Sequence, residues 1–408
     1  MPLLAAQALE RALSVLVPAL DIVEGRVDDD TPPAWCEARG WTGFLLSLSD
    51  DDLARCESAG LSACIGDLAG APPSLTELAL AAAEAARLPR HAALPLAPPA
   101  DQLQSVPARK RLQLESLLGA VAPMAARARR IVDVGAGRGH FTRIAAESFD
   151  VDALGIEREP ARVSAAAALA EGTRALFVAS DALREDLAFA PDDLLVGLHA
   201  CGELGDRMVL SAANAPCDLV LVSCCLQKIG GPARAPLSQV GARAGLVLRR
   251  EALGLTNLTA RPVGVESSLE DMLSARGHRH ALLRLLRARG LDVSPGEEMR
   301  GINRRRARFG LGELAARALS LRGMAPATEA EIREHERAAH LAFSRMRRLS
   351  LPRSMLARLT EVAVVLDRAA ALEERGHEAQ AAIVFDPDVS PRNIAILARA
   401  PVTRAMAP

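Results

Sequence analysis

Short apolar runs rich in β-branched residues alternate with helical segments through the middle of this chain. Residues 159–170 and about 205–213 have helical periodicity, and a further helix follows the first run through about residue 148. Such alternation is typical of βαβ units and predicts a mainly parallel sheet with flanking helices. The five strand-like runs cover residues 130–135, 151–157, 175–180, 194–200 and 218–224.

The pattern changes to arginine-rich amphipathic helices between about 235 and 378, where no convincing strand is found. Residues 381–387 and 393–398 are again strand-like, and a short turn containing Pro391 joins them. We therefore predict that an antiparallel hairpin completes the sheet after a helical insertion at about 235–378.

The first hundred residues differ from the rest. They contain several short helical segments and end in the Pro- and Ala-rich stretch HAALPLAPPA before the basic segment PARKR. We expect a mainly helical N-terminal accessory domain at 1–100 and a second domain at 101–408.

Composition indicates a soluble globular protein, because 50% of the residues are hydrophobic and charges interrupt every apolar run before ~18 residues. The first 20 residues read as an amphipathic helix and not as a signal peptide. Seven cysteines form an odd set without framework spacing, which favours reduced thiols. We expect a cytoplasmic protein without a membrane partner.

A glycine-rich loop follows the first predicted strand. Asp133 ends that strand, and Gly135, Gly137 and Gly139 precede the next helix, which is the context of a nucleotide-binding loop. A dinucleotide fingerprint would have glycine where His140 stands, because its third glycine comes one residue later. The spacing therefore favours S-adenosylmethionine over a dinucleotide.

Acidic residues follow the second and third predicted strands. Glu157 lies 22 residues after Gly135, where a carboxylate can accept hydrogen bonds from both hydroxyls of a ribose. Asp181 stands where an adenine amino group would be recognised, with the backbone amide of Ala182 beside it; capping of a helix at DALREDL is the alternative. Loop and carboxylates together predict an S-adenosylmethionine site in a Rossmann-like α/β fold of the class I methyltransferase type.

Ligands of such sheets lie beyond the carboxyl ends of the strands, so residues after the fourth and fifth strands are expected to face the methyl acceptor. His199 is a candidate general base or a structural histidine, and Lys228 is one of two lysines in an arginine-rich chain. Cys201 and Cys224 are candidates for thiolate addition to a pyrimidine, or small buried hydrophobes.

Zinc binding by His199 together with Cys201, Cys224 and Cys225 is a further alternative for this edge. Without a C-x-x-C pair we do not expect a metal there.

Four segments give the chain a family resemblance: PARKRLQLE with Lys110, GLHACGEL, the VSCC run with its following lysine, and FDPDVSPRN. Together they resemble the methyltransferase domain shared by methyltransferase-like and "ribosomal RNA adenine dimethylase domain-containing" proteins, with distant similarity to a tRNA 2′-O-methyltransferase family. The resemblance covers roughly 105–230 and 380–400. It implies methyl transfer more firmly than it implies an acceptor.

Two features of these segments bear on the acceptor side. The family usually has Tyr-His after the cysteine pair, where this chain has Leu226 and Gln227. Arg392 and Asn393 could reach the acceptor pocket from the hairpin, although a tight turn also explains residues of these types.

We expect an S-adenosylmethionine-dependent methyltransferase, with RNA as one candidate acceptor and partner. The chain lacks N/D-P-P-Y after the fourth strand, which disfavours methylation of the adenine amino group. A catalytically degenerate scaffold that binds S-adenosylmethionine or RNA, and an NAD(P)-dependent oxidoreductase, are the alternatives. An RNA backbone or simply solvent would account for the exposed arginines of the insertion, which are Arg304, Arg305, Arg306, Arg308, Arg345, Arg347, Arg348 and Arg353.

Overall fold

A computed structural model describes residues 4–27, 31–92, 95–98, 100–104, 106–185, 187–259 and 269–401. The chain forms two compact units. The sheet unit consists of Met1–Glu24, Leu80–Val263 and Leu356–Pro408, and the helical unit consists of Gly25–Ala79 and Gly264–Met355.

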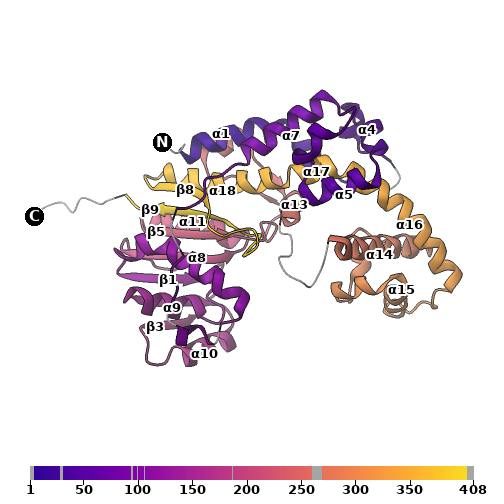
Figure 1. Cartoon of the computed structure of the whole chain (residues 1–408). Coiled ribbons are helices and arrows are strands. Elements are labelled where there is room, and N and C mark those ends of the chain that lie inside the picture. Colours follow the sequence, from indigo (N-terminus) through magenta and orange to yellow (C-terminus); the bar gives the residue numbers. More distant parts are fainter. Residues whose placement is uncertain are drawn as a thin grey trace, which may run out of the picture. The chain divides into compact units, whose positions relative to one another are not determined.

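A seven-stranded sheet is the centre of the sheet unit, with the order β3-β2-β1-β4-β5-β9-β8 (Figure 1). Strands β1 to β5 are parallel to their neighbours, whereas β9 is antiparallel to both β5 and β8. The predicted α/β fold with an antiparallel terminal strand is confirmed. The strands are β1 (Arg130–Val134), β2 (Asp152–Glu157), β3 (Ala175–Ala179), β4 (Asp193–Ala200), β5 (Asp218–Ser223), β8 (Glu378–Ile383) and β9 (Ile394–Arg399).

Charged residues mark where the central strands begin. Asp193 at the start of β4 accepts a 2.7 Å ion pair from Arg130, and Asp218 at the start of β5 accepts one of 2.7 Å from Arg127. Strand β5 is buried along its whole length, as expected for a parallel strand covered on both faces. With these ion pairs at the amino-terminal edge, the carboxyl-terminal edge is left for the loops that carry the candidate site.

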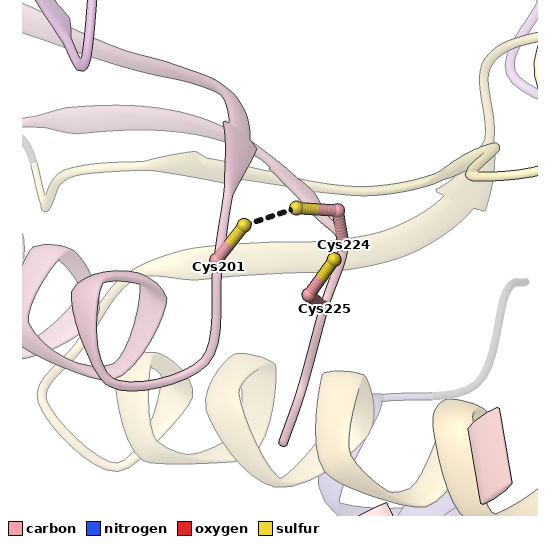
Figure 2. A group of neighbouring side chains, drawn as sticks. All are labelled: Cys201, Cys224 and Cys225. Atoms are coloured by element: carbon pink, nitrogen blue, oxygen red, sulfur yellow. Dashed lines mark hydrogen bonds between the residues drawn. The ribbon is translucent and has the colours of Figure 1, made fainter. Parts of the chain in front are cut away.

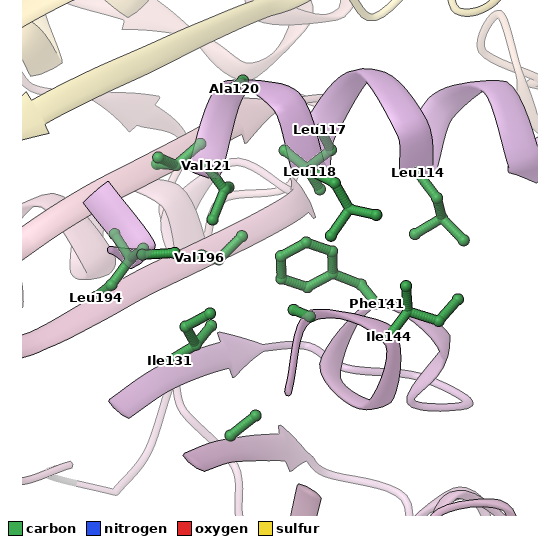
Figure 3. Packing of buried hydrophobic residues seen from close by; sticks show 14 of the residues in the cluster. Leu114, Leu117, Leu118, Ala120, Val121, Ile131, Phe141, Ile144, Leu194 and Val196 are labelled. Carbon is green, nitrogen blue, oxygen red and sulfur yellow. The ribbon is translucent and has the colours of Figure 1, made fainter. Parts of the chain in front are cut away.

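Helices α8 and α9 cover the first strands. Leu117 and Leu118 of α8 pack with Phe141 and Ile144 of α9 over Ile131 of β1 (Figure 3). The remaining α10 and α11 follow β2 and β4, as the alternation predicted. These helices are α8 (Ala108–Ala125), α9 (His140–Phe149), α10 (Pro160–Leu169) and α11 (Glu203–Asn214).

Helix α18 (Ala357–Glu373) is buried along most of its length and packs on β8, β9 and α11. Helix α1 (Ala5–Leu16) lies beside α18, with Leu9 and Leu16 fully buried. The backbone N–H groups of Ala5 and Ala6 donate to the Glu373 carboxylate at 2.7 and 2.9 Å. Residues 1–24 therefore belong with the sheet and not with an accessory domain ending near residue 100.

The region expected as one insertion at 235–378 is divided between the units. Its first part stays with the sheet and includes a two-residue ladder of β6 (Ala233–Arg234) and β7 (Leu248–Arg249), which the sequence pattern did not indicate. Helices α12 (Gln239–Arg243) and α13 (Arg250–Leu255) accompany this ladder. Only Gly264–Met355 joins the helical unit.

The helical unit is built around α14 (Leu269–Ala288), which packs on α15 (Leu311–Ser320) and α16 (Glu329–Leu349). Its core includes Leu282, Leu286, Leu311 and Leu314. None of the helices that the structure describes is long and apolar enough to cross a membrane. The shorter helices of the chain are α2 (Leu20–Glu24), α3 (Ala34–Ala38), α4 (Thr42–Ser47), α5 (Asp50–Ala59), α6 (Leu61–Cys64), α7 (Pro73–Ala85) and α17 (Leu351–Met355).

Candidate cofactor and acceptor site

The glycine loop between β1 and α9 has left-handed backbone at all three glycines, with φ of 81° at Gly135, 60° at Gly137 and 70° at Gly139. The N–H groups of Gly135 and Ala136 donate to the carbonyl oxygen of Ile156 at 2.8 and 3.0 Å, which fixes the loop against the end of β2. A Cβ on Gly139 would collide with the Phe177 ring, whereas one on Gly137 would meet no atom within 4 Å. Gly137 therefore borders open space that a ligand can approach closely.

Glu157 is tied to this loop. Its Oε2 accepts the N–H of Gly137 at 3.0 Å, and its Oε1 accepts the N–H of Glu159 at 3.2 Å. The side chain is buried at the end of β2. A carboxylate has about four acceptor positions, so each oxygen keeps capacity for a hydroxyl of a ligand.

Asp133 supports the loop from below. Its Oδ2 accepts the hydroxyl of Thr142 at 2.6 Å, which joins the end of β1 to α9. Burial raises the pKa of Asp133 to about 6, although the Thr142 hydrogen bond opposes that shift. This contact accounts structurally for Asp133, while its assignment to the cofactor stays a prediction.

Asp181 caps a turn, which was the alternative to a role in adenine recognition. Its Oδ1 accepts the N–H of Leu183 at 3.1 Å, and its own N–H donates to Glu185 at 3.2 Å. The expected helix at DALREDL is a turn, with Ala182 inside it. Contact of Asp181 and Ala182 with adenine stays a prediction.

Polar atoms without partners lie beside the glycine loop, and sequence reasoning did not assign them. His140 begins α9, and its Nδ1 is buried with no hydrogen-bond partner among the described residues. Burial lowers the pKa of His140, and the charges of Lys110 and Arg143 lower it further. Lys110 thus stands close to the loop. Gln102, whose main chain accepts from Arg143 at 2.8 Å, also has a buried Oε1 with no described partner.

The acceptor edge brings three cysteines together (Figure 2). Strands β4 and β5 are adjacent, and Ala200 is in register with Ser223, so the residues that follow them meet. The Sγ atoms of Cys201 and Cys224 are 2.6 Å apart, and those two and the Sγ of Cys225 all lie within 4.8 Å of one another.

The cysteine pair is electrostatically asymmetric. A hydrogen bond from Cys224 lowers the pKa of Cys201, and the Cys225 backbone and the charge of Lys228 act in the same direction. The same hydrogen bond, together with burial, raises the pKa of Cys224. The arrangement favours a thiolate at Cys201, with Cys224 as its donor.

The structure thus groups three of the four residues predicted for catalysis, Cys201, Cys224 and Lys228. His199 belongs to β4 by its backbone, but its side chain lies outside the described residues. Its predicted roles in catalysis and cofactor binding stay predictions.

Arg368 of α18 holds both cysteine-bearing segments, and sequence reasoning missed it. Its Nη2 donates to the carbonyl oxygen of Gly202 at 2.7 Å, and its Nη1 donates to the hydroxyl of Ser223 at 2.7 Å. Its Nε donates to Asp206 at 2.8 Å. One fully buried guanidinium therefore fixes the residue after Cys201 and the residue before Cys224.

Arg234 completes this buried network. It pairs with Asp206 at 2.9 Å and with Asp367 at 2.8 Å. A signal was present in the sequence, because Asp367 and Arg368 interrupt the apolar run of α18, and buried charges in such a run require partners.

Arg392 and Asn393 do not serve the acceptor pocket as one alternative proposed. Arg392 donates to Glu361 of α18 at 3.1 Å and to the Asn257 side chain at 2.8 Å. The Oδ1 of Asn393 accepts Arg358 at 3.0 Å. Both side chains fasten the hairpin to α18, and both are buried.

The departure after the cysteine pair has two different outcomes. Leu226 is 1% exposed and packs as a core residue. Gln227 has a buried Oε1 with no partner among the described residues, so a polar acceptor here is free to bind a ligand.

Residues 109–231 match the model of a family described as a methyltransferase domain. The matched range contains the glycine loop, Glu157 and the three cysteines of the acceptor edge. The match supports methyl transfer as the class of reaction and S-adenosylmethionine as the cofactor.

Solved structures similar to this chain include a TehB-like S-adenosylmethionine-dependent methyltransferase from Corynebacterium glutamicum. It is 20% identical over 26% of this chain and 60% of its own, with a TM-score of 0.23. An amino pentose methyltransferase of calicheamicin biosynthesis from Micromonospora echinaspora is 21% identical over 28% and 50%, with a TM-score of 0.24. A Pyrococcus abyssi tRNA (uracil-54, C5)-methyltransferase is 18% identical over 28% of each chain, with a TM-score of 0.23.

The chain thus spans between about a quarter and three-fifths of the length of these three structures. Their acceptors differ, and we draw nothing about the acceptor from them.

Proposed function

We propose that this chain transfers a methyl group from S-adenosylmethionine to RNA. The observation that carries the cofactor part is the Glu157 carboxylate, held by the N–H of Gly137 beside a glycine loop that leaves open space. Bound S-adenosylmethionine supplies an electrophilic methyl group on its sulfonium sulfur.

The chain's own residues would bind the ribose and orient the cofactor. Glu157 accepts the two ribose hydroxyls with the acceptor positions that Gly137 and Glu159 leave open. Gly137 permits close approach of the ligand because no side chain stands there. His140 offers an imidazole nitrogen that has no described partner.

The acceptor side would be formed by Cys201, Cys224 and Lys228. Cys201 presents a thiolate, Cys224 stabilises it by donating its S–H, and the charge of Lys228 favours the anion. A thiolate there either receives a proton from the acceptor or adds to the ring of a pyrimidine. Gln227 is a candidate to hold the acceptor through its Oε1.

RNA is the proposed acceptor because the chain beyond residue 100 carries a net charge of +7, from −1 overall minus the −8 of the first hundred residues. Such an excess favours a polyanionic partner over a small neutral one.

The test is transfer of radiolabelled methyl from S-adenosylmethionine into a cell extract that is then separated into RNA, protein and small molecules. We expect label in RNA with the wild-type chain and none with Glu157→Ala. Calorimetry on both proteins would show whether the variant has lost the cofactor. Label in another fraction would contradict RNA as acceptor, and cofactor binding without any label would favour a scaffold.

Cys201→Ala tests the acceptor side separately. We expect cofactor affinity to stay unchanged while methyl transfer falls at least ~100-fold, as is typical when a catalytic group is removed. A covalent adduct with 5-fluoropyrimidine RNA in the wild type, absent in this variant, would identify ring addition; full activity of Cys201→Ala would remove the residue from catalysis.

A further inference from the structure

The helical unit contains a groove of about 320 Å³ beside α14 and α16 whose lining is strongly basic. Its single lining carboxylate is that of Glu298, so the formal charge of the lining is +5 − 1 = +4 with histidine neutral. We call it the arginine groove. Its arginines are Arg26, Arg276, Arg279, Arg287 and Arg353.

Protein contacts balance little of this charge. Arg279 pairs with Glu298 at 2.7 Å, and Arg287 donates to the carbonyl oxygen of Val293 at 3.0 Å. Arg276 is exposed and lies 5.8 Å from the centre of the Phe343 ring. Partial desolvation lowers the pKa of Arg276, and the charge of Arg279 lowers it further. An anion in the groove would relieve this repulsion.

A larger cavity of about 910 Å³ shares Phe343 with the arginine groove. Leu273 and Ala281 give it an apolar wall, and His278 and His340 add rings to its lining. The volume is within the ~300–1,000 Å³ of sites that hold small organic groups.

Phe343 is therefore the wall between an anion-binding groove and a partly apolar cavity. Its ring already stacks with His280, with the ring centres 6.1 Å apart and the planes at 29°. Flat bases stack on such rings, and phosphates bind arginine, so the pair of hollows has the two kinds of surface that a nucleotide presents.

We infer that the helical unit binds single-stranded RNA, with backbone phosphates in the arginine groove and a base in the adjoining cavity. The inference deepens the proposed function, on which it rests for the identification of the bound RNA as the methyl acceptor. Binding itself does not depend on methyl transfer.

These arginines differ from most of those that the sequence singled out. Arg347 pairs with Glu57, Arg348 with Asp50 and Arg306 with Glu313. Of that set, Arg353 lines the groove within the part of the chain that the structure describes.

The test is fluorescence anisotropy of a labelled single-stranded RNA of about 20 nucleotides, titrated with the full chain. Charge reversal by Arg276→Glu should weaken binding at least ~10-fold and reduce the salt dependence of the affinity. Arg304→Glu is the matched control, because Arg304 is exposed and lines neither hollow. It should change the affinity less than ~2-fold.

A second, milder variant guards against misfolding. Arg26→Gln removes one exposed charge and should lower the salt slope by about one unit, with the thermal unfolding curve unchanged. Equal losses in Arg276→Glu and Arg304→Glu would overturn the groove in favour of a diffuse surface. Displacement of RNA by inorganic tripolyphosphate at equal phosphate concentration would overturn it in favour of a small-anion site.

Calorimetry with S-adenosylmethionine separates this inference from the proposed function. RNA binding that is lost in Arg276→Glu while cofactor affinity is unchanged supports the groove. A wild-type chain that binds the cofactor but no RNA overturns the groove and leaves methyl transfer to another acceptor standing.

Discussion

The cofactor edge and the acceptor edge of the same sheet are held in different ways. At the cofactor edge the contacts are short in sequence: Glu157 binds an N–H 20 residues away, and Asp133 binds a hydroxyl nine residues away. At the acceptor edge Arg368 reaches Gly202 across 166 residues. The first is fixed by local backbone geometry and the second by a buried ion network, so mutations should damage them differently.

The largest effect is expected from Arg368→Met, which removes a fully buried cation from Asp206, Ser223 and Gly202. Breaking a buried pair by removing one partner typically costs ~3–5 kcal/mol because the remaining charge is left without compensation. Denaturant unfolding should show that loss. The matched control is Arg375→Met, an exposed arginine just beyond the same helix, for which we expect less than ~0.5 kcal/mol.

Similar unfolding free energies for both variants would mean that the network does not stabilise the acceptor edge. If Arg368→Met folds, a cofactor affinity equal to that of the wild type would support the separation of the two edges, because Arg368 contacts no residue of the glycine loop in the hydrogen bonds described above.

A smaller effect, confined to the cofactor edge, is expected from Gly139→Ala. Its Cβ would enter the space of the Phe177 ring at a φ of 70°, so the loop must move. We expect cofactor affinity to fall ~10–100-fold, equivalent to about 1.4–2.7 kcal/mol. Gly172→Ala is the control for backbone strain alone, because it has a φ of 83° and no atom near the added Cβ.

Calorimetry with S-adenosylmethionine distinguishes the two glycines. Both substitutions carry the cost of a left-handed alanine, about 1 kcal/mol of stability. Equal cofactor affinities in both variants would show that the geometry of Gly139 does not matter for binding.

What could be predicted from sequence follows the same division. The strands, the glycine loop and Glu157 were found because apolar alternation and glycine spacing are local signals. The position of Cys201 beside Cys224 followed from the rule that parallel strands share a carboxyl edge. Arg368 was missed because its partners lie on other elements, and Arg392 was misassigned because a turn motif does not show which helix its side chain reaches.

The division between the units also exceeded local information. A helix at residues 5–16 was expected, but its packing on α18 depends on a segment more than 300 residues later. Amphipathic periodicity identifies the buried face of a helix and does not identify its partner.

The smallest and most specific effect concerns Cys201. If Cys224 donates to a thiolate, Cys224→Ala removes the donor and must raise the pKa of Cys201, so that alkylation by iodoacetamide slows most at low pH. Cys225→Ala should raise it less, because its side chain is the weakest of the named causes. Burial raises the pKa of both Cys56 and Cys217 to about 12, which keeps these thiols protonated during the titration.

Peptide mass spectrometry of the alkylated protein gives the midpoint for each cysteine. We expect the wild-type Cys201 midpoint below the ordinary thiol value of about 8.5, with upward shifts in the order Cys224→Ala then Cys225→Ala. A wild-type midpoint of 8.5 or more, at about the free thiol value, would leave the acceptor edge without its thiolate. A midpoint that moves only with Cys224 would instead show that the contact between two strand ends, fixed by a helix far along the chain, is what activates Cys201.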